Sequence, residues 1–127
     1  MSYSVATFAT RIAEELGIST ETAYMCGILD LSDKKDVPLN RMTAARIVHR
    51  ALIYMGEFDV KDYQRALELK DIYDCHTCVI HVAQVYIKGI MEPTQPEIFG
   101  MQKEVALEEA EDIVKKMMNP KMRLIIV

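Results

Sequence analysis

Apolar residues recur every three to four positions in four long stretches of the chain, the spacing that places side chains on one face of a helix. These stretches cover residues 4–16, 41–55, 78–91 and about 105–118. The widest apolar stripe lies in the second stretch and consists of Ala44, Ala45, Ile47, Val48, Ala51, Leu52 and Met55. A stripe of that width is typical of a central helix. The pattern therefore predicts an all-α fold.

Polar caps and glycines mark where these helices begin and end. Ser4 and Asn40 precede two of the stretches, where a short polar side chain accepts a hydrogen bond from a free backbone N–H. Gly17 and Gly56 follow those stretches, and glycine suits the left-handed conformation that ends a helix. A further short helix is predicted over residues 20–28.

Polar segments connect the helices. Residues 30–38 form a loop that ends at a proline, which favours an extended approach to the next helix. Residues 57–74 join the two halves of the chain. Within them, Asp59 is expected to cap a short helix over residues 60–67.

The composition agrees with a single helical domain over residues 1–127. Half of the 127 residues are apolar, and there are only five glycines and four prolines. This length fits one domain with its own core, and the turn residues are too sparse for an all-β sandwich. No apolar run approaches the roughly 18 residues that a membrane-spanning helix needs, so we expect no membrane insertion.

Charge and motifs argue against several classes of function. The net charge is −4 with acidic and basic residues mixed along the chain, so no basic stripe is available for nucleic acid. Nucleotide-binding, hydrolase and zinc-protease motifs are absent, and we expect neither an enzyme nor a cofactor. Arg11, Glu14 and Glu15 argue against an N-terminal secretion signal. We expect a cytoplasmic protein if the chain is complete, and a cell-surface protein if it is part of a longer exported one.

One helix-ending motif occurs twice. Gly27-Ile28-Leu29 and Gly89-Ile90-Met91 each end an apolar stretch, and each is followed by a polar loop with proline and then by another helix. This unit resembles the S-layer homology repeat. In that repeat a short motif ending in Asp opens a first helix, which ends in Gly-Ile-hydrophobic, and a Thr-Arg-Ala-Glu motif opens a second helix. Leu69-Lys70-Asp71 stands at the place of the first motif and Asn40-Arg41-Met42-Thr43 at the place of the last.

The resemblance implies a pseudo-threefold prism of helices with the second helices at its centre. The second helices would cover residues 4–16, 41–55 and 105–118, because the segments that open them align with one another. Only two first helices match, at residues 20–28 and 78–91.

The resemblance also implies a binding site. In this family the arginine of the Thr-Arg-Ala-Glu motif helps to hold an anionic, pyruvylated cell-wall polysaccharide. A guanidinium at a helix N-terminus is well suited to a carboxylate. Arg41 is the matching arginine, so Asn40, Arg41 and Thr43 are the predicted ligand-binding residues. Val5 and Leu107 occupy the two other arginine positions and cannot bind an anion.

The leading hypothesis is a non-catalytic module that binds a protein partner or an acidic cell-wall glycan. The competing class is a cytoplasmic structural or regulatory protein that assembles as an oligomer. A metal or thiol site is the third alternative.

The third alternative depends on a cluster of cysteines and histidines. Cys75 and Cys78 with His81 could supply three ligands to Zn²⁺, and only Cys26 or His49 could add a fourth. Because the ligand count stops at three, we expect no metal. Cys78 is instead expected to pack in the core, and a redox pair is a further alternative. The odd number of cysteines argues against a disulfide framework.

The last four residues, Leu124-Ile125-Ile126-Val127, are all large and aliphatic. A free segment of this kind would be an adhesive edge, which soluble proteins avoid. We expect it to lie as an extended segment or strand, either in a groove of its own chain or across a symmetric interface. The second arrangement is favoured, which predicts a homodimer.

Overall fold

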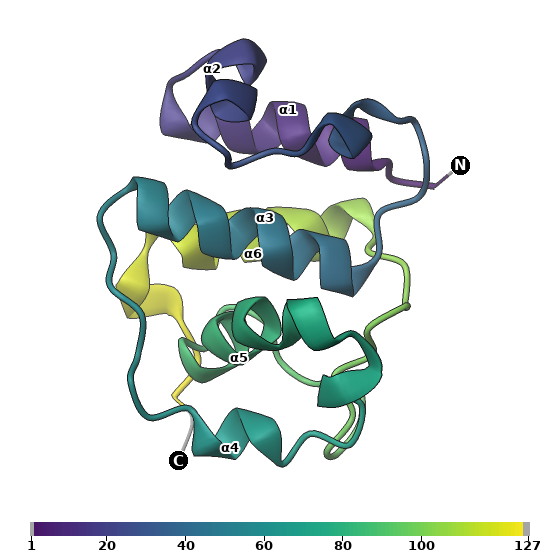
Figure 1. The fold of residues 1–127 in the computed structure, drawn as a ribbon, viewed down its shortest axis with the longest axis vertical. Helices are drawn as coiled ribbons and strands as arrows, with labels where there is room; N and C mark the ends of the chain where they lie inside the picture. The colour runs from purple at the N-terminus through teal and green to yellow at the C-terminus, as the bar shows by residue number, and fades with distance from the viewer. Residues whose placement is uncertain (1, 126–127) are drawn as a thin grey trace.

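The computed structural model describes residues 2–125, and across that range the chain forms helices and no β-strand (Figure 1). The α-helices are α1 (Val5–Leu16), α2 (Thr20–Met25), α3 (Arg41–Tyr54), α4 (Gln64–Leu67), α5 (Val79–Ile87) and α6 (Leu107–Met118). Short 3-10 helices cover Leu31–Lys34, Ile72–Asp74, His76–Cys78 and Pro120–Met122. The predicted all-α fold is confirmed. In residues 2–125, no helix has both the length and the apolar character needed to cross a membrane.

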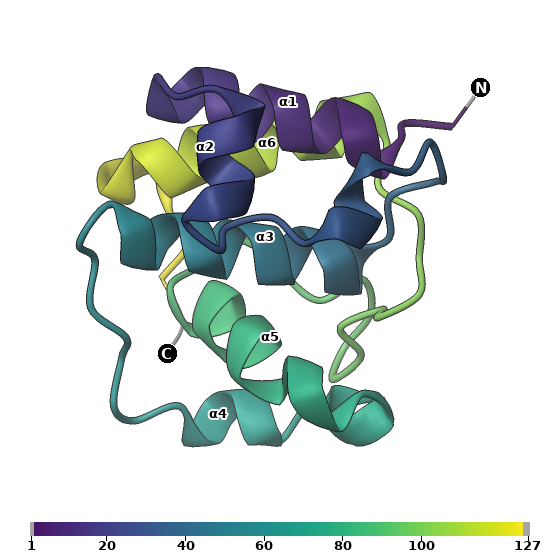
Figure 2. The ribbon, with the colours of Figure 1, turned by 45° about the horizontal axis from the view of Figure 1, so that its top comes forward.

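The three longest helices run in the same direction and pack around a common core (Figures 1 and 2). Helix α1 contacts both α3 and α6, while α2 packs on α1. On the other side α5 packs on α3, and α4 packs on α5. Ile47 and Val48 of α3 are completely buried. The predicted central position of this helix is therefore confirmed.

The helix starts follow local capping chemistry. Ser4 Oγ accepts a hydrogen bond from the Thr7 amide at 3.1 Å, and Asn40 Oδ1 accepts one from the Thr43 amide at 2.8 Å. Helix α6 has no such side-chain cap. It begins at Leu107 rather than at about residue 105, because Ala106 keeps an extended backbone with ψ of 164° while Val105 pairs with Leu39.

Short extended segments before α1, α3 and α6 bring the starts of these helices together. The Leu39 amide donates to Tyr3 O at 2.9 Å, and the Leu39 carbonyl accepts from Val105 N at 2.8 Å. The Arg41 amide donates to Lys103 O at 2.9 Å. Leu39 is completely buried between its two neighbours. Backbone pairing therefore gathers three segments, far apart in sequence, at one end of the bundle.

The two glycine motifs end their helices in the same way. Gly27 and Gly89 have φ of 81° and 74°, a left-handed conformation that favours glycine. The two residues after Gly27 donate their amides to the carbonyl of Ala23, and the two after Gly89 donate theirs to the carbonyl of Val85. Because these bonds turn the chain back, α2 and α5 are shorter than the predicted 20–28 and 78–91.

The predicted helix over residues 60–67 is wrong in its first half. Only Gln64–Leu67 is helical, and Tyr63 occupies the N-cap position. Asp59 caps nothing, because its carboxylate lies 2.7 Å from His49 Nε2 on α3.

The tail docks on its own chain as far as it is described. The guanidinium of Arg123 donates to both carboxylate oxygens of Glu57 at 2.8 and 2.9 Å, and the Leu124 amide donates to Gly89 O at 2.9 Å. The expected extended tail from Met122 onward is wrong at Met122, which belongs to the 3-10 helix Pro120–Met122, whereas Arg123 has an extended backbone and Ile125 is 88 % exposed. Residues 126 and 127, half of the aliphatic segment, lie outside the described range.

Replacing Gly89 with alanine should release this tail. A Cβ at this position would overlap the backbone of Leu124, which cannot rotate away as a side chain can. We expect the Leu124 amide to lose its protection from hydrogen exchange. We also expect the free energy of unfolding to fall by more than the roughly 1–2 kcal/mol that a left-handed alanine costs alone.

Gly27→Ala is the matched control. Gly27 has a similar positive φ, but a Cβ there would meet no atom within 4 Å. Its loss of stability should reflect backbone strain alone. Equal losses in the two variants, with Leu124 still protected, would contradict the docking of the tail.

Candidate functional site

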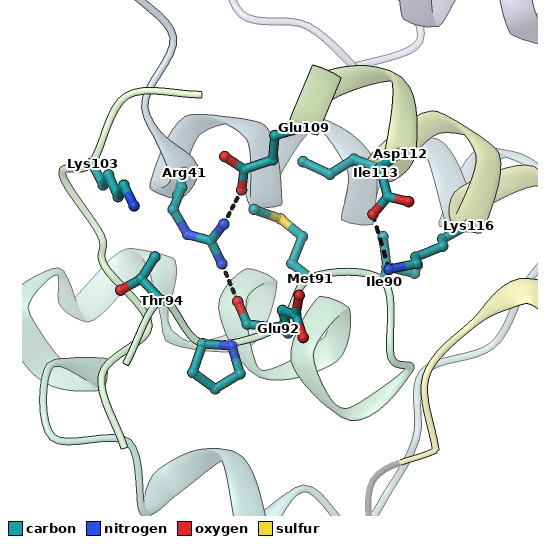
Figure 3. Close-up of a pocket in the computed structure, with 11 residues that line it drawn as sticks. Arg41, Ile90, Met91, Glu92, Thr94, Lys103, Glu109, Asp112, Ile113 and Lys116 are labelled. Carbon is teal, nitrogen blue, oxygen red and sulfur yellow. Dashed lines mark hydrogen bonds and ion pairs between the residues drawn. The ribbon is translucent and has the colours of Figure 1, made fainter. Parts of the chain in front are cut away.

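A groove of about 270 Å³ lies where the start of α3 faces α6 and the loop after α5 (Figure 3). Its polar lining comes from all three segments and consists of Arg41, Glu92, Thr94, Lys103, Glu109, Asp112 and Lys116. Ile90, Met91, Pro93 and Ile113 form its apolar part. Of the three predicted ligand-binding residues, Arg41 is the one that lines this groove.

Arg41 is held by the protein itself. Its side chain is 5 % exposed, and its Nε donates to Phe99 O at 2.9 Å. One terminal nitrogen donates to the Glu109 carboxylate and the other to the Glu92 carbonyl. The guanidinium also lies over the Phe99 ring, 4.7 Å from its centroid. Burial lowers the pKa of Arg41, and the Glu109 carboxylate counteracts that effect.

Asn40 and Thr43 meet in the helix cap described above, where the Asn40 side chain accepts the Thr43 amide. Neither residue lines the groove. Their predicted role in ligand binding stays a prediction, and what the structure assigns to them is the start of α3. Asn40 and Thr43 thus cap helix α3, whereas Arg41 between them lines the groove.

Lys103 is the groove cation that sequence reasoning missed. It forms no ion pair within residues 2–125, and its side chain extends beside Arg41 (Figure 3). Lys116, by contrast, is paired with Asp112 at 2.9 Å. No local motif marks Lys103, because it reaches the groove only through the pairing of its carbonyl with the Arg41 amide.

Asp71 anchors the loop that carries Lys103. Its carboxylate accepts the amides of Phe99 and Gly100 at 2.8 Å each, and that of Met101 at 3.2 Å. Burial alone would raise the pKa of Asp71, but these backbone donors outweigh it, so the pKa is lowered. The aspartate that ends the family-like motif therefore positions one wall of the groove.

The cysteine and histidine residues do not assemble into one site. Cys75 and Cys78 are joined in a disulfide, because the 3-10 turn between them brings their Cα atoms to 5.2 Å. The argument against disulfides from an odd cysteine count is wrong for this pair, and Cys26 remains as an exposed free thiol. Within residues 2–125, no group of three His, Cys, Asp or Glu side chains is placed to hold a metal ion.

His81 instead forms a chain of side chains with His49 and Asp59. His49 Nε2 lies 2.7 Å from Asp59 Oδ1, and His49 Nδ1 lies 2.8 Å from His81 Nδ1. A carboxylate only accepts, so Nε2 of His49 carries a proton; with both rings neutral, His81 Nδ1–H donates to His49. Burial, then His49 and the cations Arg50 and Arg46, lower the pKa of His81 to about 4, although Asp30 acts the other way.

This buried pair should make stability depend on pH. His81 takes up a proton near pH 6.5 in the unfolded chain and only near pH 4 in the folded one. The free energy of unfolding should therefore fall as the pH drops from 6.5 to 4, by about 1–2 kcal/mol after discounting for the solvent-exposed part of the ring. Denaturant titrations at a series of pH values measure this.

His81→Gln should flatten the dependence in that window, because the titrating group is gone. His76→Gln is the matched control, since His76 is exposed on the same segment. If the pH dependence of the free energy of unfolding survives His81→Gln and disappears with His76→Gln, its source is His76 and not His81.

No protein-family model, no curated protein and no solved structure matches this chain. The resemblance to S-layer homology repeats rests on the two glycine motifs, Leu69-Lys70-Asp71 and Asn40-Arg41-Met42-Thr43.

Proposed function

We propose that the chain is a non-catalytic binding module, similar in design to S-layer homology domains, that recognises an acidic group of a cell-wall glycan or of a protein partner. The binding site is the groove between α3, α6 and the loop that follows α5. The observation that carries the proposal is Lys103, a cation that is free of ion pairs within residues 2–125, beside a rigid polar groove.

The arrangement of the helices supports the resemblance to that family. Three parallel helices have their starts joined by paired extended segments, and the two glycine motifs end their helices with the same hydrogen bonds. These features suit a pseudo-threefold repeat in which α1, α3 and α6 are second helices and α2 and α5 are first helices. Helix α4, with only four residues, stands where no first helix was predicted.

Within the groove, Lys103 is the group that favours a single acidic group as ligand. Arg41 pairs with Glu109 and Lys116 with Asp112. Of the two other charged groups of the lining, the Glu92 carboxylate and the Lys103 ammonium, Lys103 is the one that can pair with an acidic ligand. A groove of about 270 Å³ suits a sugar unit or one acidic side chain rather than a large molecule. In this proposal Arg41 shapes the site and Lys103 contacts the ligand.

Lys103→Glu should weaken the binding of purified pyruvylated cell wall by about tenfold or more, because a charge-assisted hydrogen bond becomes a repulsion. Lys61→Glu, the same change at an exposed lysine outside the groove, should bind like the wild type. Sedimentation of the protein with cell wall measures both. Equal binding by the two variants would show that the groove is not the binding site.

Two further measurements sharpen this test. If a glycan is the ligand, the wild-type protein should no longer bind cell wall from which the pyruvyl groups have been removed. If a protein is the ligand, the wild type should capture an acidic protein that Lys103→Glu does not capture. The binding of Arg41→Ala is measured together with its unfolding curve, because removing one partner of a buried ion pair costs about 3–5 kcal/mol of stability.

We also propose that the chain forms a homodimer. The Met25 side chain is 87 % exposed and that of Phe58 92 %, and Ile125 extends past the docked part of the tail. Single exposed apolar residues such as Met25 and Phe58 are common on protein surfaces, so it is the exposed aliphatic end of the tail that favours an interface. The tail contributes its end to that interface while Arg123 and Leu124 stay on their own chain.

Light scattering should show a dimer for the full chain and a monomer for a chain that ends at Leu124. This truncation keeps the contacts of Arg123 and Leu124, so the fold is retained, whereas a chain ending at Asn119 would lose them. A full chain that is monomeric would refute the dimer, and a truncated chain that stays dimeric would exclude the tail as the interface.

A further inference from the structure

The disulfide between Cys75 and Cys78 lies at the start of α5, away from the residues of the groove. The two cysteines flank a single 3-10 turn, and Cys78 is the N-cap residue of the nine-residue helix. Both side chains are half-buried, while His76 and Thr77 between them are exposed. The bond therefore lies in a partly exposed turn and not inside the core.

The fold gains little from this bond. A disulfide stabilises mainly by closing a loop in the unfolded chain, and this one spans a sequence separation of only three. The turn is already held by the Cys78 amide, which donates to Cys75 O at 3.1 Å, and by the completely buried side chain of Ile72. The two sulfurs can separate without opening the core, so the bond is suited to reversible chemistry.

The two sulfurs have different surroundings. Cys78 packs against the hydrophobic core and is the N-cap residue of α5, whose first backbone amides donate to no capping side chain. The positive end of the helix dipole at this start stabilises a thiolate, which makes Cys78 the better leaving group. Cys75 Sγ lies 3.5 Å from the hydroxyl of exposed Thr77, which donates to it because a disulfide sulfur has no hydrogen. Cys75 is therefore the sulfur open to attack.

We propose that Cys75 and Cys78 form a thiol–disulfide exchange site for low-molecular-weight thiols of the glutathione type. This function is separate from glycan or partner binding in the groove.

The exchange takes place in two balanced steps. The thiolate of a first small thiol attacks Cys75 Sγ, the bond between the two cysteines breaks, and the electron pair leaves with Cys78 as a thiolate. A second small thiol then attacks its own kind in the mixed disulfide and releases Cys75 as a thiolate. The two protons lost by the small thiols end on Cys75 and Cys78. Two small thiols are oxidised to their disulfide, and the protein disulfide is reduced by two electrons.

The test uses the full chain with Cys26→Ser, so that Cys75 and Cys78 are the only cysteines. The protein is equilibrated with mixtures of reduced and oxidised glutathione, quenched with acid, labelled with a maleimide and weighed by mass spectrometry. We expect a reversible change between no and two labelled thiols, with an unchanged helical circular dichroism spectrum. A bond that resists glutathione in the folded protein and opens only in denaturant would make it a structural disulfide and overturn the proposal, as would two free thiols in oxidised glutathione.

The position of the mixed disulfide tests the order of the steps. The Cys26→Ser chain is mixed with reduced glutathione, quenched early with acid, digested and analysed by mass spectrometry. We expect glutathione on Cys75 and a free thiol on Cys78, because Cys78 leaves as the thiolate. Glutathione found mainly on Cys78 would overturn the assignment of Cys75 as the attacked sulfur.

Discussion

The buried guanidinium of Arg41 joins three parts of the chain that are far apart in sequence. It is attached to the first turn of α3, it pairs with Glu109 of α6, and it donates to the carbonyls of Glu92 and Phe99 in the loop after α5. A charge in this position is stable only while its partners are present, because an unpaired buried ion costs several kcal/mol. This side chain therefore fixes the relative placement of the three segments together with the backbone pairs before α3 and α6.

The loop that meets Arg41 is held from its other side by Asp71. Three consecutive backbone amides of the loop donate to that carboxylate, so the segment has little freedom to move. Lys103 follows two residues after the last of these amides, and its carbonyl is paired with α3. A cation on such a segment is presented at a defined place, which lowers the entropic cost of binding a ligand.

The two ends of α5 differ in kind. Its start carries the disulfide of Cys75 and Cys78, which closes a short turn at the edge of the core. Its end is occupied by the tail: Glu57 accepts Lys88 Nζ at 2.7 Å and both nitrogens of the Arg123 fork, and the Gly89 carbonyl accepts Leu124. Burial would raise the pKa of Glu57, but these two cations outweigh it and lower it. Opening the disulfide at the start of α5 can thus leave the tail docked at the end of α5.

The sequence by itself determined the features that depend on neighbouring residues. The apolar period placed α1, α3 and α6, and the caps at Ser4 and Asn40 marked two of the helix starts, because both signals act within a few residues. It also pointed to Arg41. The tertiary structure decided that Arg41 is buried and that Lys103 faces the groove. It also decided that Asp59 bonds His49 instead of starting a helix. Each of these features depends on contacts between residues that are distant in the chain. Local periodicity and capping residues carry no information about the energies of such contacts.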